Sequence, residues 1–143
     1  MKLVTYSKNG QEQLAFLVNE KLYDTNVANA ALPATIMPML NNWEALVDVA
    51  RKTEDDIKSG KLSIEGTAYN SAVVMAPVPN PTSCRDGYAF RQHVAAARRN
   101  RKVDMIAEFD QYPIFYFTNH NAIQGPGDIV CMPDHFQKLD FEL

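Results

Sequence analysis

Prolines at alternate positions of residues 77–81 constrain this chain more than any other feature of its sequence. They follow a short apolar run at residues 73–76 that is typical of a strand. Proline fixes φ at about −65° and lacks a backbone N–H, so this spacing predicts a stiff, extended connector and excludes a central strand. The sequence therefore predicts two parts, a β/α module over residues 1–75 and a second part over residues 76–143.

The first part begins with a pattern of short strands. Runs rich in apolar and β-branched residues predict strands over residues 2–6, 12–18 and 21–24. Asn9-Gly10 and Asn19-Glu20 lie between these runs and favour hairpin turns. The alternation along the second strand is only partly amphipathic, so we expect cover on both faces. Since a meander of about three short strands is barely stable alone, it should pack on the segment after residue 24.

Helices are expected next. Thr25-Asn26 and Thr35 are N-cap candidates for two short helical pieces, and Asn42 is the candidate for a longer helix over residues 43–57. The apolar positions of that helix recur near helical spacing, at Trp43, Leu46, Val47 and Ala50. We interpret the acidic run Glu54–Asp56 as a solvated face, because nothing apolar surrounds it.

The second part carries the best candidate for chemistry. Asp86 lies seven residues before His93, and Ser83 is a suitable cap for a helix running from about Asp86 to Lys102. On one helix, Asp86 and His93 would share a face. An acid beside an imidazole suits either a metal ligand near a base, or a base with its orienting acid. The alternative is structural, with Asp86 favouring the helix start and His93 partly buried as a packing residue.

Cationic residues gather at the far end of the expected helix, at Arg98, Arg99, Arg101 and Lys102. Positive charge is favourable near a helix C-terminus, which needs no function. The functional alternative is that one arginine binds the carboxylate of an anionic substrate. Asp104 and Glu108 follow closely, so the region does not form a basic surface for nucleic acid.

Three further strands are predicted. Residues 112–117 hold four aromatic side chains, which are typical of a core strand, and residues 129–132 are apolar and β-branched. A tight turn at residues 125–128 lies between them. Residues 139–143 begin another strand, on which Asp140 and Glu142 point to the same face.

Three motifs of the second part resemble, in order and spacing, those of the fumarylacetoacetate hydrolase family. Asp86–His93 matches D-x-Y-x-x-R-Q-H, Gly125–Asp128 matches G-P-G-D, and Leu139–Leu143 is similar to L-D-[YFM]-E-x-E. The resemblance covers residues 70–143 well and is weaker before them. It implies an α+β fold, in which the small N-terminal β/α module precedes the start of a β-rich, fumarylacetoacetate-hydrolase-type catalytic domain over residues 76–143.

The family hydrolyses a carbon–carbon bond in a 1,3-diketo acid, and the resemblance implies a role for six residues. It implies His93 as the catalytic base, Asp86 and Glu142 as metal ligands, and Tyr88, Arg101 and Tyr116 as substrate contacts. The implied metal is Mg²⁺ or Ca²⁺, with Mn²⁺ as a further choice. A hard cation held by carboxylates polarises the oxygens of a diketone, and a histidine with an ordinary pKa of about 6.5 suits general-base work.

The chain departs from the family at its end, because Leu143 precedes the family's second glutamate by one residue. The family's other acid ligand, its substrate-binding lysine and its orienting acid come from further downstream. We therefore expect a natural protein longer by ~200 residues. The 143 residues alone should be an inactive N-terminal fragment with open apolar strands that self-associates.

Other functions stay open. Related family members decarboxylate oxaloacetate-like acids, or isomerise or hydrate related dicarboxylates, although the Asp-x-Tyr…His pattern favours the hydrolase. A hypothesis from another class is a non-catalytic interaction or structural domain.

Composition narrows the class of protein. Hydrophobic residues make up 46%, charged residues 22%, and the net charge is −3, an ordinary globular balance that attracts neither nucleic acid nor an anionic membrane. No signal peptide or apolar span of about 20 residues is visible. Cys84 and Cys131 are far apart and favour a reducing compartment. We expect a cytoplasmic protein that binds a small diketo acid and, by the resemblance, forms a homodimer at full length.

Overall fold

The computed structural model describes residues 1–131 and 134–138. The chain forms two compact units: unit 1 consists of residues 1–77 and 124–143, and unit 2 consists of residues 78–123. Both contain helices and antiparallel strands, so the fold is mixed α+β, as predicted.

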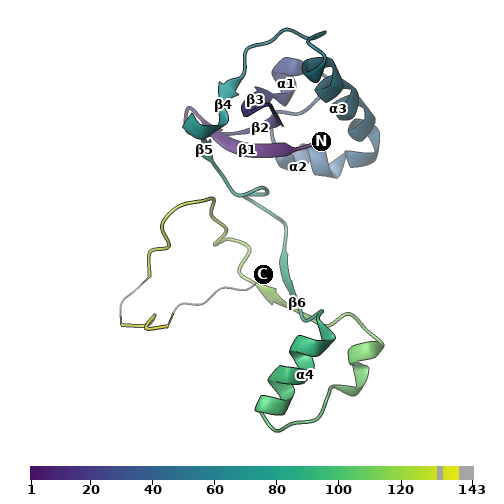
Figure 1. Ribbon diagram of the computed structural model, residues 1–143, viewed down its shortest axis with the longest axis vertical. Coiled ribbons are helices and arrows are strands. Elements are labelled where there is room, and N and C mark those ends of the chain that lie inside the picture. The colour runs from purple at the N-terminus through teal and green to yellow at the C-terminus, as the bar shows by residue number, and fades with distance from the viewer. Residues whose placement is uncertain (132–133, 139–143) are drawn as a thin grey trace. The chain divides into compact units, whose positions relative to one another are not determined.

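A five-stranded antiparallel sheet is the frame of unit 1 (Figure 1). The predicted meander is confirmed as β1 (Leu3–Lys8), β2 (Gln11–Val18) and β3 (Lys21–Asp24). Two short strands, β4 (Thr67–Ala68) and β5 (Val73–Val74), complete the order β4-β3-β2-β1-β5.

The sheet is curled, and a short link joins its two edges. The 3-10 turn η1 (Tyr69–Ser71) leads directly from β4 at one edge to β5 at the other. The Tyr69 N–H donates to the Glu20 carbonyl at 2.9 Å, and the Met75 N–H donates to the Thr5 carbonyl at 2.9 Å. These hydrogen bonds hold the link against both edges of the meander.

Three helices gather on one side of the sheet (Figure 1): α1 (Thr25–Ala28), α2 (Ile36–Asn41) and α3 (Trp43–Lys58). Thr35 and Asn42 occupy the N-cap positions of α2 and α3, as expected, although neither side chain makes the capping hydrogen bond. For α1 the predicted caps, Thr25 and Asn26, lie one and two residues too late, because Asp24 is the N-cap.

Both faces of β2 are covered, as its partly amphipathic pattern predicts. Its buried residues Leu14, Phe16 and Val18 share one face by strand alternation. On the other face, Ala15 packs with Tyr6 and Leu22. The buried apolar residues of the helical segment are Leu32, Ile36, Met39, Ala50 and Ile57.

The prediction for the inner face of α3 is wrong in part. Ala50 is buried, but Thr53, Glu54 and Ile57 are the other buried residues, and the predicted stripe before Ala50 is only half-buried. Glu54 therefore does not lie on a solvated face. Its carboxylate accepts hydrogen bonds from the Lys58 ammonium at 2.8 Å and the Lys2 backbone N–H at 3.4 Å. A carboxylate can be buried when cationic and N–H donors surround it.

Unit 2 contains a two-stranded ribbon, β6 (Cys84–Gly87) with β7 (Phe115–Thr118), together with α4 (Arg91–Asn100) and η2 (Ala107–Asp110). The predicted aromatic strand is confirmed as β7, although it begins three residues late. The predicted helix begins only at Arg91, because the residues before it extend into β6.

The chain returns to unit 1 at the G-P-G-D turn. A Cβ on Gly125 would lie 2.6 Å from the Val74 carbonyl oxygen, so only glycine allows this close approach to β5. Of the strand predicted over residues 129–132, the described residues 129–131 form no strand. Met132 and the predicted strand 139–143 lie outside the described residues.

Candidate functional site

The β6–β7 ribbon brings two of the predicted site residues together. Asp86 and Tyr116 are directly opposite each other in the register. The Tyr116 hydroxyl donates a hydrogen bond to Asp86 Oδ2 at 2.7 Å. Asp86 is half-buried and Tyr116 is exposed, so the pair faces solvent on unit 2.

His93 lies in the first turn of α4, with its side chain exposed. The helix face that the spacing predicts for Asp86 and His93 does not exist, because Asp86 belongs to β6. The reason is long-range pairing, since the ladder with β7 holds Asp86 in an extended strand. A pattern read over eight residues contains no information about that distant partner.

Tyr88 continues the line of β6 beyond the last paired residue. Its N–H donates to the Ile114 carbonyl at 2.9 Å, and its ring meets that of Phe109 edge-on, with centroids 6.3 Å apart. Tyr88 is thereby held at the end of the ribbon that carries Asp86.

Arg101 is the C-cap residue of α4 and is exposed. Two hydrogen bonds end the helix there: the Lys102 N–H donates to the Arg99 carbonyl at 3.0 Å, and the Val103 N–H donates to the Arg98 carbonyl at 3.1 Å. This is the Schellman pattern, with Lys102 in the left-handed position at a φ of 56°. Both interpretations of the basic helix end, charge near a helix terminus and a carboxylate contact, remain compatible with it.

A hard-cation site is incomplete within the described residues. No group of three or more His, Cys, Asp and Glu side chains there could hold a metal ion. Asp86 offers one carboxylate of the kind that Mg²⁺ and Ca²⁺ bind, whereas these ions take about six or more oxygens. The predicted second ligand, Glu142, lies outside the described residues. Asp86 therefore suits the role of a single metal ligand, and the described residues alone do not form a complete metal site.

The sequence did not reveal an ion pair that joins α4 to η2 in unit 2. The Arg91 guanidinium donates two hydrogen bonds to the Asp110 carboxylate, both at 2.9 Å, and these hold the pKa of Asp110 below its usual range. Arg91 also borders an open depression of about 360 Å³ on α4, together with Gln92, Ala95 and Arg99. Their shared helix face was the available signal, because Arg91, Ala95 and Arg99 recur every four residues.

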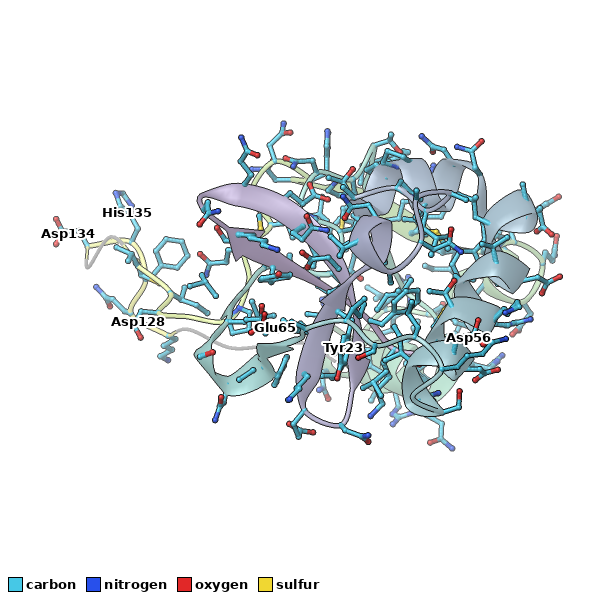
Figure 2. The ribbon with its side chains drawn as sticks, turned by 90° about the horizontal axis from the view of Figure 1, so that it is seen from above. Tyr23, Asp56, Glu65, Asp128, Asp134 and His135 are labelled. Atoms are coloured by element: carbon cyan, nitrogen blue, oxygen red, sulfur yellow. The ribbon has the colours of Figure 1, made fainter. Side chains whose placement is uncertain are left out.

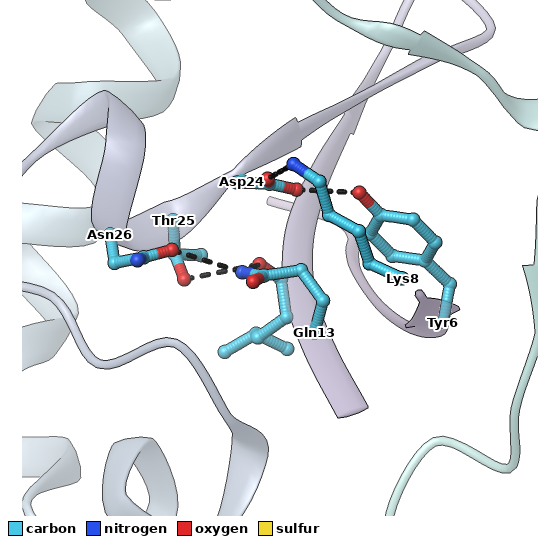
Figure 3. A network of polar contacts seen from close by, with 7 residues as sticks. Tyr6, Lys8, Gln13, Asp24, Thr25 and Asn26 are labelled. Carbon is cyan, nitrogen blue, oxygen red and sulfur yellow. Dashed lines mark hydrogen bonds and ion pairs between the residues drawn. The ribbon is translucent and has the colours of Figure 1, made fainter. Parts of the chain in front are cut away.

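A second polar cluster that the sequence did not reveal lies inside unit 1 (Figure 3). The Asp24 carboxylate accepts a hydrogen bond from the Tyr6 hydroxyl at 2.7 Å and another from the Lys8 ammonium. Beside it, the Thr25 hydroxyl donates to the Leu14 carbonyl at 3.1 Å. Each of these acceptors is matched to a donor, which indicates a structural lock between strands rather than a reactive group.

Two acidic side chains and one histidine in the segment after Gly125 are exposed to solvent. Asp128, Asp134 and His135 are exposed and belong to no regular element (Figure 2). His135 and His120 both lie outside any helix or strand.

Neither a scan of protein-family models nor a search of curated proteins finds a match to this chain. Within the described ranges, no helix has the length and apolar character needed to cross a membrane.

Proposed function

We propose that this chain is the N-terminal part of a metal-dependent hydrolase that cleaves a carbon–carbon bond in a 1,3-diketo acid. The observation that supports it most is the Asp86–Tyr116 hydrogen bond. The family resemblance assigns these two residues to one site, although they lie thirty positions apart. Their meeting on one ribbon, in the unit that also holds Tyr88 and His93, is what such a site requires.

Each residue has a distinct task in the proposal. His93 accepts a proton from water, and the resulting hydroxide adds to one carbonyl carbon of the substrate. The bond from that carbon to the neighbouring methylene breaks, and the electron pair leaves as an enolate that takes up a proton. The products are a carboxylic acid and a methyl ketone.

The remaining residues bind and orient. Arg101 pairs with the substrate carboxylate, and Tyr88 and Tyr116 contact the substrate. Asp86 and Glu142 would hold Mg²⁺, Ca²⁺ or Mn²⁺, which supplies positive charge near the developing enolate. The proposal includes a cytoplasmic homodimer as the working form.

The base assignment is tested by His93→Ala in the protein that carries this chain. We expect kcat for diketo acid hydrolysis to fall by about 10²–10⁴, because a general base contributes that much. Mg²⁺ affinity, measured by calorimetry, should be unchanged. Asp86→Ala, by contrast, should weaken Mg²⁺ binding, because it removes a proposed metal ligand.

His120→Ala is the matched control, since this histidine lies in a loop of the same unit. It should leave kcat within about twofold. If His93→Ala keeps more than about a tenth of the activity, the base is another group. If Asp86→Ala leaves Mg²⁺ affinity intact, Asp86 is not a ligand.

Two alternatives make different predictions. A decarboxylase, isomerase or hydratase of this family would convert a related dicarboxylate and leave a 1,3-diketo acid intact, which product analysis distinguishes. A non-catalytic interaction domain would convert neither the dicarboxylate nor the 1,3-diketo acid. The observation that favours interaction is the exposure of all four residues of β7.

A further inference from the structure

The 3-10 turn η2 contacts both elements of unit 2 that carry proposed site residues. Its last residue, Asp110, accepts two hydrogen bonds from Arg91, which begins α4 two positions before His93. The residue before it, Phe109, meets the Tyr88 ring edge-on, with the rings inclined at 84°. One four-residue turn therefore joins the helix of the proposed base to the strand end that carries a proposed substrate contact.

Hydrogen bonds at both ends make η2 a defined turn. The Phe109 N–H donates to the Ile106 carbonyl at 3.1 Å, and the Gln111 N–H donates to the Glu108 carbonyl at 3.0 Å. Successive residues of a 3-10 helix lie about 120° apart around its axis, so Phe109 and Asp110 reach different neighbours. Because these two residues are adjacent along the chain, a shift of one also shifts the other.

The Arg91–Asp110 pair orients η2 more than it stabilises the fold. Both side chains are exposed, and exposed ion pairs contribute little to folding. A cation in the first turn of a helix also opposes the helix dipole, so local helix chemistry does not explain Arg91 at this position. The contact is bidentate, from Nε and Nη2 of Arg91 to both carboxylate oxygens, and such a fork fixes direction as well as distance.

We propose that η2 braces the proposed site, with Phe109 and the Arg91–Asp110 pair as positioning residues. The inference rests on the proposed function, in which Tyr88 contacts the substrate and His93 is the base. Phe109 fixes the orientation of the Tyr88 ring, and the ion pair fixes η2 against the start of α4. Without the brace Tyr88 and His93 shift relative to each other, and a misplacement of about 1 Å slows a positioned reaction by about 10²-fold.

Kinetics of the protein that carries this chain test the ion pair. Arg91→Lys keeps the charge but loses the planar fork. We expect kcat/KM for the diketo acid to fall by about tenfold or more, through a higher KM and a lower kcat, while the thermal midpoint stays within about 2 °C. Arg51→Lys is the matched control, because it makes the same change at an exposed ion pair of unit 1, and it should leave both constants unchanged.

The aromatic contact is tested in the same assay. Phe109→Leu removes the ring that meets Tyr88 and should also lower kcat/KM by about tenfold. Phe109→Tyr keeps a ring there and should stay within about twofold of the parent protein. Equal losses in the two variants would show that the ring contact does not position Tyr88.

NMR of the tyrosine rings measures the position of Tyr88 without any substrate. The Phe109 ring shifts the Tyr88 resonance, and Phe109→Leu gives the reference value without that ring. Arg91→Lys should move the resonance toward this reference, because η2 loses its fixed contact with α4. Arg91→Asp combined with Asp110→Arg should restore the parent value, since the fork is rebuilt with its charges exchanged.

The two measurements distinguish failure of the brace from failure of the proposed function. An unchanged Tyr88 resonance in Arg91→Lys, or unchanged kcat and KM in a protein that hydrolyses the diketo acid, would overturn the brace. A parent protein that leaves the diketo acid intact would overturn the proposed function and, with it, the positioning role. The Tyr88 resonance would still show whether η2 holds the ring.

Discussion

At the scale of single residues, Asp24 connects the two strands that β2 separates. It pairs in register with Ala15, whose small side chain leaves room for the Tyr6 ring to reach across from β1. We expect Asp24→Ala to lower the free energy of unfolding by about 1–3 kcal/mol, because the buried Tyr6 hydroxyl then loses its acceptor. Urea denaturation measures this.

The matched comparison for that change is Asp48→Ala. Asp48 is exposed and contacts Arg51 at 3.5 Å, so its removal should stay within about 0.5 kcal/mol. Equal losses in the two variants would show that the Asp24 cluster contributes no more than a surface ion pair.

The same cluster predicts a loss of stability at alkaline pH. Burial, aided by the hydrogen bond to Asp24, raises the pKa of Tyr6, and the hydrogen bond to Asp24 raises the pKa of Lys8. Both groups hold their protons more tightly in the folded chain than in the unfolded one. Their contribution is complete below the unfolded pKa values, at about pH 10, and is lost as pH rises through the folded ones.

The free energy of unfolding should therefore fall above about pH 10. Tyr6→Phe removes one of the two titrating groups, so its alkaline slope should be shallower than that of the parent chain. Urea titrations at several pH values compare the slopes, and parallel slopes would contradict the role of Tyr6.

No local sequence pattern predicts the cluster around Asp24. Tyr6, Lys8 and Asp24 belong to strands that are not neighbours in the sheet, and their meeting depends on the register of β2 between them. By contrast, the Asp86–Tyr116 contact joins two residues that a motif resemblance had already assigned to one site. The family resemblance predicted those two residues, whereas their contact follows only from the register of the two strands.

At the scale of elements, the sequence predicts what local chemistry decides. The first hairpin turn has Asn9 at a φ of 53° and Gly10 at 78°, left-handed values that Asn-Gly adopts readily. Likewise α3 begins after Asn42, as its pattern indicates. The predicted start of α4 was wrong, because Asp86 and Gly87 belong to β6, which pairs with the distant strand β7.

The end of α4 offers a direct test of local strain. Lys102 occupies the left-handed position of the Schellman motif, which glycine adopts without steric cost. We expect Lys102→Gly to stabilise α4 by about 0.5–1 kcal/mol, seen as slower amide exchange at Val94 and Ala97. Arg99→Gly, inside the same helix, should destabilise it by about 1 kcal/mol. A change in the same direction for both would refute the strain at Lys102.

At the scale of the whole molecule, the two units differ in how much apolar surface they bury. In unit 1 the sheet and helices bury large side chains such as Leu14, Phe16 and Met39. In unit 2, within the described residues, Val94 is the only fully buried apolar side chain. The sequence predicted β7 by its aromatic composition, but composition does not show whether a strand finds cover, and the rings of β7 remain exposed.

Unit 2 should therefore lose its structure at a lower free energy than unit 1. Local opening depends on buried apolar contacts, and one buried valine is worth only about 1.5–3 kcal/mol. We expect amide hydrogens of α4 to exchange at least about 10²-fold faster than those of β2, which should exchange only on unfolding of unit 1. Phe16→Ala provides the comparison: it should cost unit 1 about 3–5 kcal/mol and leave α4 exchange nearly unchanged. If α4 and β2 exchanged at one common rate that rose together in Phe16→Ala, the two units would unfold as a single cooperative body.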